Sequence, residues 1–110
     1  MATPAHFAEV EWIAKSADIQ VRINTLAPGS ATPWHFHTAV TDNIFCLEGE
    51  IEVGLRDPDR TETLRPGGRQ EISPGRVHRV VNHGDRALRY LLVQATGPYD
   101  FQVVASDPAP

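Results

Sequence analysis

Residues 29–49 are GSATPWHFHTAVTDNIFCLEG, and the choice of fold and of functional site starts from this stretch. Near its centre, His35 and His37 stand two positions apart. Residues i and i+2 of a β-strand project from the same face, so both imidazoles can converge on one point. Trp34 and Phe36 then turn to the opposite face. The stretch therefore predicts a strand with one histidine face and one aromatic face.

Two further residues extend this pair to a possible set of four ligands. Asp42 can add a carboxylate if the chain folds back beside the first strand, and His78 lies in a later candidate strand. Three imidazoles and one carboxylate, with positions left open for water or substrate, suit one divalent Mn, Fe, Co, Ni, Cu or Zn ion. A His-X-His pair alone is weak evidence, because ordinary strand histidines also produce it. The surrounding sequence must therefore distinguish metal ligands from ordinary strand histidines.

Short strand-like runs separated by turn residues occupy most of the chain. Residues 19–26 alternate apolar and polar side chains and stop at a Pro-Gly turn. Further candidate strands are 43–47, 50–53, 70–72, 77–81, 88–94 and 99–104. No window of a dozen residues has a clear 3.6-residue apolar period, although a short helix over 7–16 is one possibility. Many short strands at this spacing indicate an all-β sandwich or barrel.

The spacing around the histidines resembles the two conserved motifs of the cupin superfamily. The first is Gly29, five residues, His35-X-His37, four residues, Asp42, six residues, Gly49. The second is Gly67, five residues, Ser73-X-Gly75, two residues, His78, three residues, Asn82. The resemblance implies an all-β double-stranded β-helix (jelly-roll) barrel. It also implies a single domain over 1–110, with the motif core at 29–82 and a flexible tail at 105–110.

By the same resemblance, the metal ligands are His35, His37, Asp42 and His78. Two positions depart from the family pattern. The family usually has Glu where this chain has Asp42, which is shorter by one methylene and can ligate the metal directly, reach it through water, or not reach it. The alternative for Asp42 is a turn or strand-start carboxylate bonded to backbone N–H groups. The proline of the second motif is replaced by Ser73, which leaves His78 in place.

The glycines of the two motifs have a conformational explanation. Gly29, Gly49 and Gly75 are expected to supply turns with positive φ, which other residues adopt with strain. Asn82 is expected to open the turn before Gly84. None of these residues is predicted to act in the site itself.

The parity of Asp42 predicts which side chains face the barrel interior. Ile44 and Cys46 share its face and, with Tyr90, are candidates for lining a pocket beside the metal. Cys46 is otherwise a small buried hydrophobe, or a thiol near the metal that ligates or oxidises. The residues between these positions should face outward.

Other polar residues are harder to place from the sequence. Arg22, Asn24, Tyr90 and Gln94 lie on alternating strands and can contact a ligand, on a face that the sequence leaves open. His6 and His83 have no partners in the sequence and are expected to be exposed.

Composition narrows the class of protein. The chain has 110 residues and a formal net charge of -4, which argues weakly against a nucleic-acid partner. Arginines gather in the second half, as a solvated surface or an anion-attracting rim around a pocket. The single cysteine excludes an internal disulfide, and neither a signal peptide nor a membrane-length apolar run is present. We therefore expect a cytoplasmic protein with no membrane partner and, by resemblance, a homodimer.

Two functions from different classes fit these residues. The first is a metal-dependent enzyme, most simply a dioxygenase or an isomerase, that acts on a small oxygenated organic substrate. The second is a module that binds or senses a small molecule such as a sugar or organic acid, without turnover. No general base is evident once the ligands are assigned, apart from Tyr90 and Cys46. The shortage of acid–base groups favours chemistry carried by the metal, but it suits a binder equally well.

Overall fold

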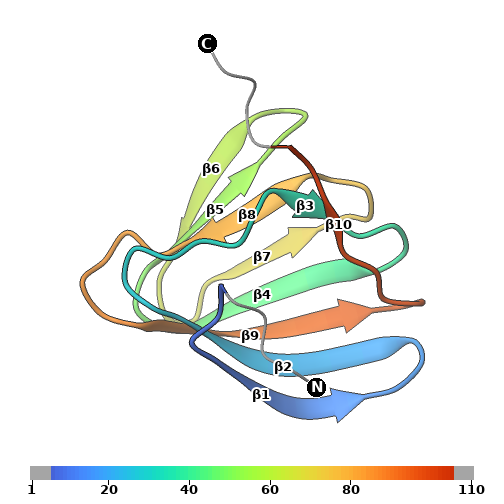
Figure 1. Ribbon diagram of the computed structural model, residues 1–110, viewed down its shortest axis with the longest axis horizontal. Coiled ribbons are helices and arrows are strands. Elements are labelled where there is room, and N and C mark those ends of the chain that lie inside the picture. The colour runs from blue at the N-terminus through green and yellow to red at the C-terminus, as the bar shows by residue number, and fades with distance from the viewer. Residues whose placement is uncertain (1–5, 106–110) are drawn as a thin grey trace.

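Ten β-strands form two five-stranded antiparallel sheets in the computed structural model, which describes residues 6–105. The first sheet has the order β1-β2-β9-β4-β7, made of β1 (Glu9–Lys15), β2 (Ile19–Leu26), β9 (Leu88–Ala95), β4 (Thr41–Glu48) and β7 (Arg69–Ile72). The second has the order β10-β3-β8-β5-β6, made of β10 (Gln102–Val103), β3 (His35–Phe36), β8 (His78–Val81), β5 (Ile51–Leu55) and β6 (Arg60–Leu64). The sheets face each other across a buried interior (Figure 1), which confirms the predicted all-β jelly-roll barrel.

The inner face of the first sheet carries three rows of buried side chains across β2, β9 and β4. The strand register aligns them as Gln20–Gln94–Asp42, then Arg22–Leu92–Ile44, then Asn24–Tyr90–Cys46. The predicted parity of β4 is therefore confirmed, because positions 42, 44 and 46 are all buried. The rows also change from polar to apolar along the strands. One end of the barrel is built to be polar inside.

The apolar core fills the other end and the middle of the barrel. It contains buried side chains from both sheets, namely Leu26, Ile44, Cys46, Ile51, Val53, Leu55, Leu64, Ile72, Val80, Leu88, Tyr90 and Leu92. Each Å² of apolar surface that these side chains remove from water stabilises the fold by about 25 cal/mol. This burial is the main force that closes the two sheets on each other. Because the apolar core stabilises the other end and the middle of the barrel, the polar end can hold a functional site.

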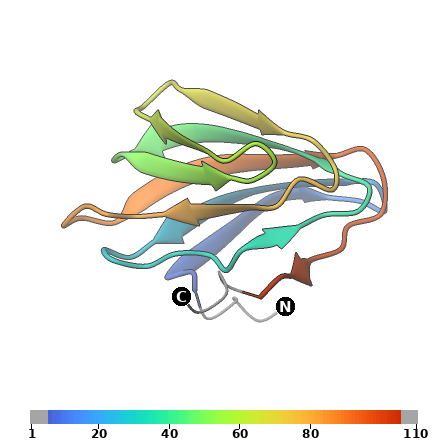
Figure 2. The same cartoon turned by 90° about the horizontal axis from the view of Figure 1, so that it is seen from above.

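The polar end brings segments that are distant in sequence next to one another. His35 on β3 is the register partner of His78 on β8. In Figure 1 the arrowhead of β9 lies at the same side of the molecule as β3 and β10. Seen from above, the segment that leads from β9 to β10 runs along β3 (Figure 2), with which β10 pairs.

Two predictions of secondary structure are wrong. Residues 9–15 of the possible helix over 7–16 form strand β1, an edge strand that pairs with β2 and is exposed over most of its length. Pairing with β2 overrides the weak local pattern. The candidate strand 99–104 shortens to Gln102–Val103, because the residues before it turn toward the polar end.

The predicted turn conformations are confirmed. Gly29, Gly49 and Gly75 have φ of 77°, 83° and 82°. Asn82 accepts a hydrogen bond at Oδ1 from the backbone N–H of Gly84 at 2.9 Å, as the predicted turn requires. Of the tail predicted to be flexible, residues 106–110 lie outside the described part of the chain. Within residues 6–105, no helix has the length and apolar character needed to cross a membrane.

Candidate metal centre

The structure brings the four predicted ligands together at the polar end of the barrel. His35 lies on β3, His37 just after it, Asp42 near the start of β4 and His78 at the start of β8. One ligand atom from each lies within 4.8 Å of those of the others, and all four residues are buried. Both sheets contribute, so the cluster exists only when the barrel is closed.

Each imidazole is held in one tautomer by the backbone. The Nδ1 atoms lie 2.7 Å from Pro33 O for His35, 2.6 Å from Asp100 O for His37 and 2.9 Å from Arg76 O for His78. A carbonyl oxygen can only accept, so each Nδ1 carries the proton and donates. In a neutral ring this leaves the Nε2 lone pair free. Backbone partners of this kind orient the histidine ligands of metal sites.

The free nitrogen atoms face the carboxylate of Asp42. Its Oδ2 lies 3.2 Å from Nε2 of His37 and 3.1 Å from Nε2 of His78. With neutral rings these are contacts between acceptors, which repel unless a proton or a cation lies among them. A divalent transition-metal ion bound by the Nε2 atoms and the carboxylate satisfies all of them at once. The residues present therefore fit a metal ion.

The electrostatics of the cluster favour the metal-binding forms of His35 and Asp42 but oppose that of His37. Burial and the neighbouring His78 lower the pKa of His35 to about 3, so the ring is neutral at neutral pH. Burial alone would raise the pKa of Asp42, but hydrogen bonds with His37 and His78 outweigh it and lower that pKa far below its usual value. For His37, burial opposes the charged ring, but the bond to Asp42 raises its pKa overall. A metal therefore competes with a proton mainly at His37.

Asp42 is also fixed from the first sheet. Gln94, its register partner on β9, donates from Nε2 to Asp42 Oδ1 at 2.9 Å. The carboxylate of Asp42 therefore contacts side chains of the cluster. These contacts do not fit the alternative in which Asp42 is a turn carboxylate bonded to backbone N–H groups. The opposite orientation of the Gln94 amide would place its oxygen against the carboxylate, so the amide orientation is determined by charge.

The segment after β9 covers the cluster. The ring of Phe101 stacks on His35 with centroids 4.3 Å apart, and Tyr99 lies 5.5 Å from the ring of His37. Sequence reasoning placed these aromatic residues only in a candidate strand over 99–104, without a role in the site. They instead close the site of their own chain, and no local periodicity signals this.

Asp100 fixes that segment to the loop after β3. Its carboxylate accepts hydrogen bonds from the backbone N–H of Thr38 at 2.7 Å and from the Thr38 hydroxyl, and these bonds lower the pKa of Asp100. Its backbone carbonyl is the partner of His37 Nδ1. The side chain therefore holds the carbonyl that orients a candidate ligand.

Asp100→Ala should weaken metal retention by about tenfold, the lower end of what is lost when an outer partner of a metal ligand is removed. The competition of the protein with a chromophoric chelator measures this. Asp85→Ala, on an exposed turn, is the matched control and should leave the affinity unchanged. Equal affinities in the two variants would mean that the bonds to Thr38 do not position His37.

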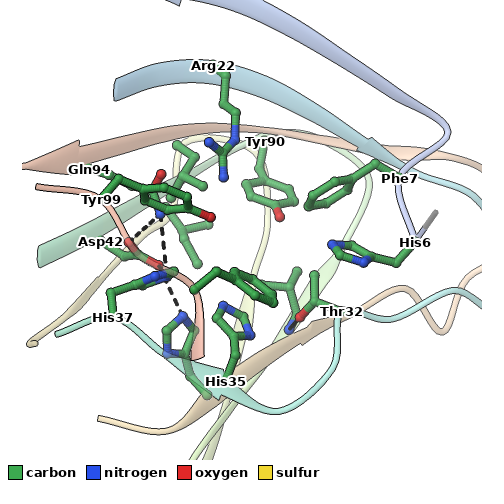
Figure 3. A pocket seen from close by; sticks show the side chains of 15 residues that line it. His6, Phe7, Arg22, Thr32, His35, His37, Asp42, Tyr90, Gln94 and Tyr99 are labelled. Atoms are coloured by element: carbon green, nitrogen blue, oxygen red, sulfur yellow. Dashed lines mark hydrogen bonds and ion pairs between the residues drawn. The ribbon is translucent and has the colours of Figure 1, made fainter. Parts of the chain in front are cut away.

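A cavity of about 240 Å³ lies over the cluster. Figure 3 shows labelled side chains that line it from several elements, with His35 and His37 on one side and Arg22 and Tyr90 on the other. The cavity is near the small end of ligand pockets, so it suits a small organic molecule. Its walls are mainly apolar and aromatic, with polar groups at the cluster and, across the cavity from it, at Arg22.

The predicted pocket residues are only partly found there. Ile44 and Tyr90 line the cavity, but Cys46 does not, and its Sγ lies 3.3 Å from the carbonyl of Gly49. Cys46 is on the predicted face but too far along β4 to reach the polar end. Burial raises the pKa of Cys46 and of Tyr90, so both stay protonated. Neither supplies the missing base.

His6 is placed differently from its prediction. It was expected to be exposed, but it is half-buried, lines the cavity and stacks on Phe101 with centroids 6.2 Å apart. His83 is exposed as expected and pairs with Glu52 at 2.8 Å. Arg22 and Gln94 point inward and line the cavity, whereas the sequence left their face open. Their orientation follows from the register of β2 with β9 and of β9 with β4, which the sequence does not reveal.

A family described as "Cupin domain" matches residues 22–94. No curated protein matches the sequence.

Solved structures match over nearly the whole chain. An uncharacterized conserved protein with a double-stranded β-helix domain from Klebsiella pneumoniae subsp. pneumoniae MGH 78578 has a TM-score of 0.79 and 21% identity, over 96% of this chain and 90% of that one. An oxalate decarboxylase from Lactobacillus farciminis, in a formate complex, has a TM-score of 0.79 and 21% identity, over 94% of this chain and 32% of that one. A recombinant oxalate oxidase in complex with glycolate has a TM-score of 0.77 and 19% identity, over 98% of this chain and 63% of that one. At these identities the likeness shows the fold alone.

Proposed function

Because this chain belongs to the cupin domain family, we propose that it is a metal-binding cupin that holds one divalent transition-metal ion and acts on a small oxygenated organic substrate. The ligands are His35, His37, His78 and Asp42. One observation carries the proposal: three Nδ1 protons are held by backbone carbonyls, while the Nε2 atoms and the Asp42 carboxylate gather within 4.8 Å.

The reaction class that we propose is that of a dioxygenase or an isomerase. A bound metal supplies a Lewis acid for a carbonyl or enolate oxygen or, if it is a redox metal, a site for oxygen. The protein's own residues orient the ligands and shape the cavity. Gln94 holds the Asp42 carboxylate, the apolar walls exclude water, and Tyr90 stays protonated next to Asn24, whose Nδ2 donates to its hydroxyl at 3.3 Å.

A binding or sensing module is the second candidate. The observation that favours it is that neither acid–base group predicted from the sequence can act as a base there, because Tyr90 is held protonated and Cys46 lies outside the cavity. The structures solved with formate and glycolate support a small organic ligand for either candidate.

A homodimer and a cytoplasmic location belong to the same proposal. The dimer rests on the resemblance to small cupins. The exposed apolar side chains Leu47 and Ile19, 39% and 40% exposed, lie at opposite ends of the outer face of the first sheet and form no contiguous patch.

Metal analysis and oxygen uptake test the proposed function. Protein prepared with Mn, Fe, Co, Ni, Cu and Zn available should carry close to one transition-metal ion per chain, as a single four-ligand site requires. Oxygen uptake or isomer formation with a panel of small acids, phenols and sugars then separates enzyme from binder. Protein that stays free of metal after supplementation would defeat the proposal, and metal-loaded protein that binds ligands without turnover would favour the second candidate.

A further inference from the structure

Arg22 brings a positive charge into the interior of the barrel. It lies on the inner face of β2, is only 9% exposed and lines the cavity above the metal cluster. Figure 3 shows its side chain extending from β2 into the cavity, which His35 and His37 line from the other side. A guanidinium stays charged at any pH that a protein tolerates, so this charge must be offset.

The protein does not offset the charge with a carboxylate of its own. Arg22 donates from Nη1 to Gln20 Oε1 at 3.0 Å, and it lies over the rings of Trp12 and Tyr99 at 5.1 and 5.5 Å. These partners are neutral. Between residues 6 and 105, no Asp or Glu lies within ion-pair distance of it. Asp42, which also lines the cavity, is bonded to the cluster and to Gln94.

The charge balance of the cavity calls for an anion. A divalent ion with neutral histidines and the Asp42 carboxylate carries a net positive charge, to which Arg22 adds one more. Burying an unpaired charge is strongly unfavourable, and a bound anion relieves it. The planar fork of arginine matches a carboxylate with two parallel hydrogen bonds.

Other atoms of the cavity also lack partners. Gln94 Oε1 and His6 Nε2 are buried and have no hydrogen-bond partner among the described residues. Because the Gln94 Nε2 bond to Asp42 fixes the amide, its Oε1 is left as an acceptor that a hydroxyl or a coordinated water would satisfy. A volume of about 240 Å³ lies just below the usual range of ligand pockets, which suits a small acid better than a nucleotide.

We propose that Arg22 anchors the carboxylate of a small organic acid, whose remaining oxygen atoms reach toward the open metal positions. This inference rests on the proposed function, since the metal provides the second contact. It narrows the substrate class from oxygenated organic molecules to small carboxylic acids, and it makes Arg22 the residue that selects them.

The test compares acids with their uncharged amides on protein of known metal content. Glycolate and pyruvate are titrated against glycolamide and pyruvamide, with inorganic phosphate as a separate anion. Calorimetry gives affinity, and the visible spectrum of the Co²⁺-loaded protein reports contact with the metal. The wild type should bind an acid at least tenfold more tightly than its amide, since hydrogen bonds to charged groups are the stronger class.

The variants assign this preference to Arg22. Arg22→Gln should lose about tenfold to a hundredfold in affinity for the acid, keep its metal content and leave the Co²⁺ spectrum of the ligand-free protein unchanged. Arg22→Lys should fall between, because it keeps the charge but not the fork. Arg89→Gln is the matched control, since Arg89 pairs with Glu48 at 2.9 Å near the surface. A melting curve for each variant confirms that it is folded.

The outcomes separate the two proposals. Metal-loaded protein in which Arg22→Gln binds the acid as tightly as the wild type overturns the role of Arg22 and leaves the proposed function standing. Preference for phosphate over every acid also overturns it. If no metal is retained, the proposed function fails, and calorimetry on that same protein still decides whether an acid binds in an Arg22-dependent way.

Discussion

Replacing His35 and His37 together by Ala should leave a folded protein that no longer retains a transition metal. Structural four-ligand zinc sites bind with roughly 10–16 kcal/mol at neutral pH, so two lost ligands remove about 5–8 kcal/mol. That is about four orders of magnitude or more in affinity. Metal content after dialysis and the metal-dependent rise in melting temperature both measure it, because a ligand that binds only the native state raises the melting temperature.

The fold should survive because neither histidine belongs to the apolar core. Asp42 also keeps the hydrogen bond that Gln94 donates to Oδ1. His83→Ala is the matched control: that imidazole is exposed and pairs with Glu52 at 2.8 Å. Full metal occupancy in the double variant, or loss of metal in His83→Ala, would show that the ion is bound elsewhere.

Asp42→Asn separates direct ligation from a supporting role. A direct carboxylate ligand that becomes an amide should weaken retention strongly, whereas a carboxylate that acts through water should weaken it only slightly. The Nδ1 bonds of the three histidines stay in place in this variant.

The histidine cluster was predictable partly from local rules and partly from the resemblance to the cupin motifs. The two-residue period of a strand places His35 and His37 on one face, and the motif spacing supplies Asp42 and His78. The inward parity of Ile44 and Cys46 follows in the same way. The same rules do not show how far the cavity extends along β4. For this reason Cys46, which shares the inward face, was wrongly expected to line the cavity.

The rest of the site depends on tertiary pairing, which one sequence does not reveal. In β2 the inward side chains are Gln20, Arg22 and Asn24, while the apolar residues between them face outward. A strand that covers an apolar core has its apolar side chains facing inward, so β2 shows the opposite pattern. Its register with β9 explains this orientation. The cover over the cluster likewise comes from Phe101, more than sixty positions after the histidine on which it stacks.

Gly49→Ala should destabilise the barrel more than Gly29→Ala does. Gly49 has φ of 83°, and a Cβ there would lie 2.9 Å from Leu88 Cβ and 3.3 Å from Leu88 Cα. Left-handed backbone costs an ordinary residue about 1–2 kcal/mol. Forcing an extra carbon against a packed core costs about 1–3 kcal/mol more. The sum of about 2–5 kcal/mol lowers the melting temperature by about 8–40 °C, since each kcal/mol shifts it by about 4–8 °C in a small domain.

Gly29→Ala isolates the backbone part of this effect. Gly29 has φ of 77°, and a Cβ there would have nothing within 4 Å. Its melting temperature should therefore fall by only about 4–8 °C, the effect of roughly 1 kcal/mol. Thermal denaturation of both metal-free variants measures the difference, which belongs to the contact with Leu88, a side chain that is 0% exposed. Equal melting temperatures would mean that the β4–β5 turn can shift away from Leu88 at no cost, and that conformation alone selects glycine at position 49.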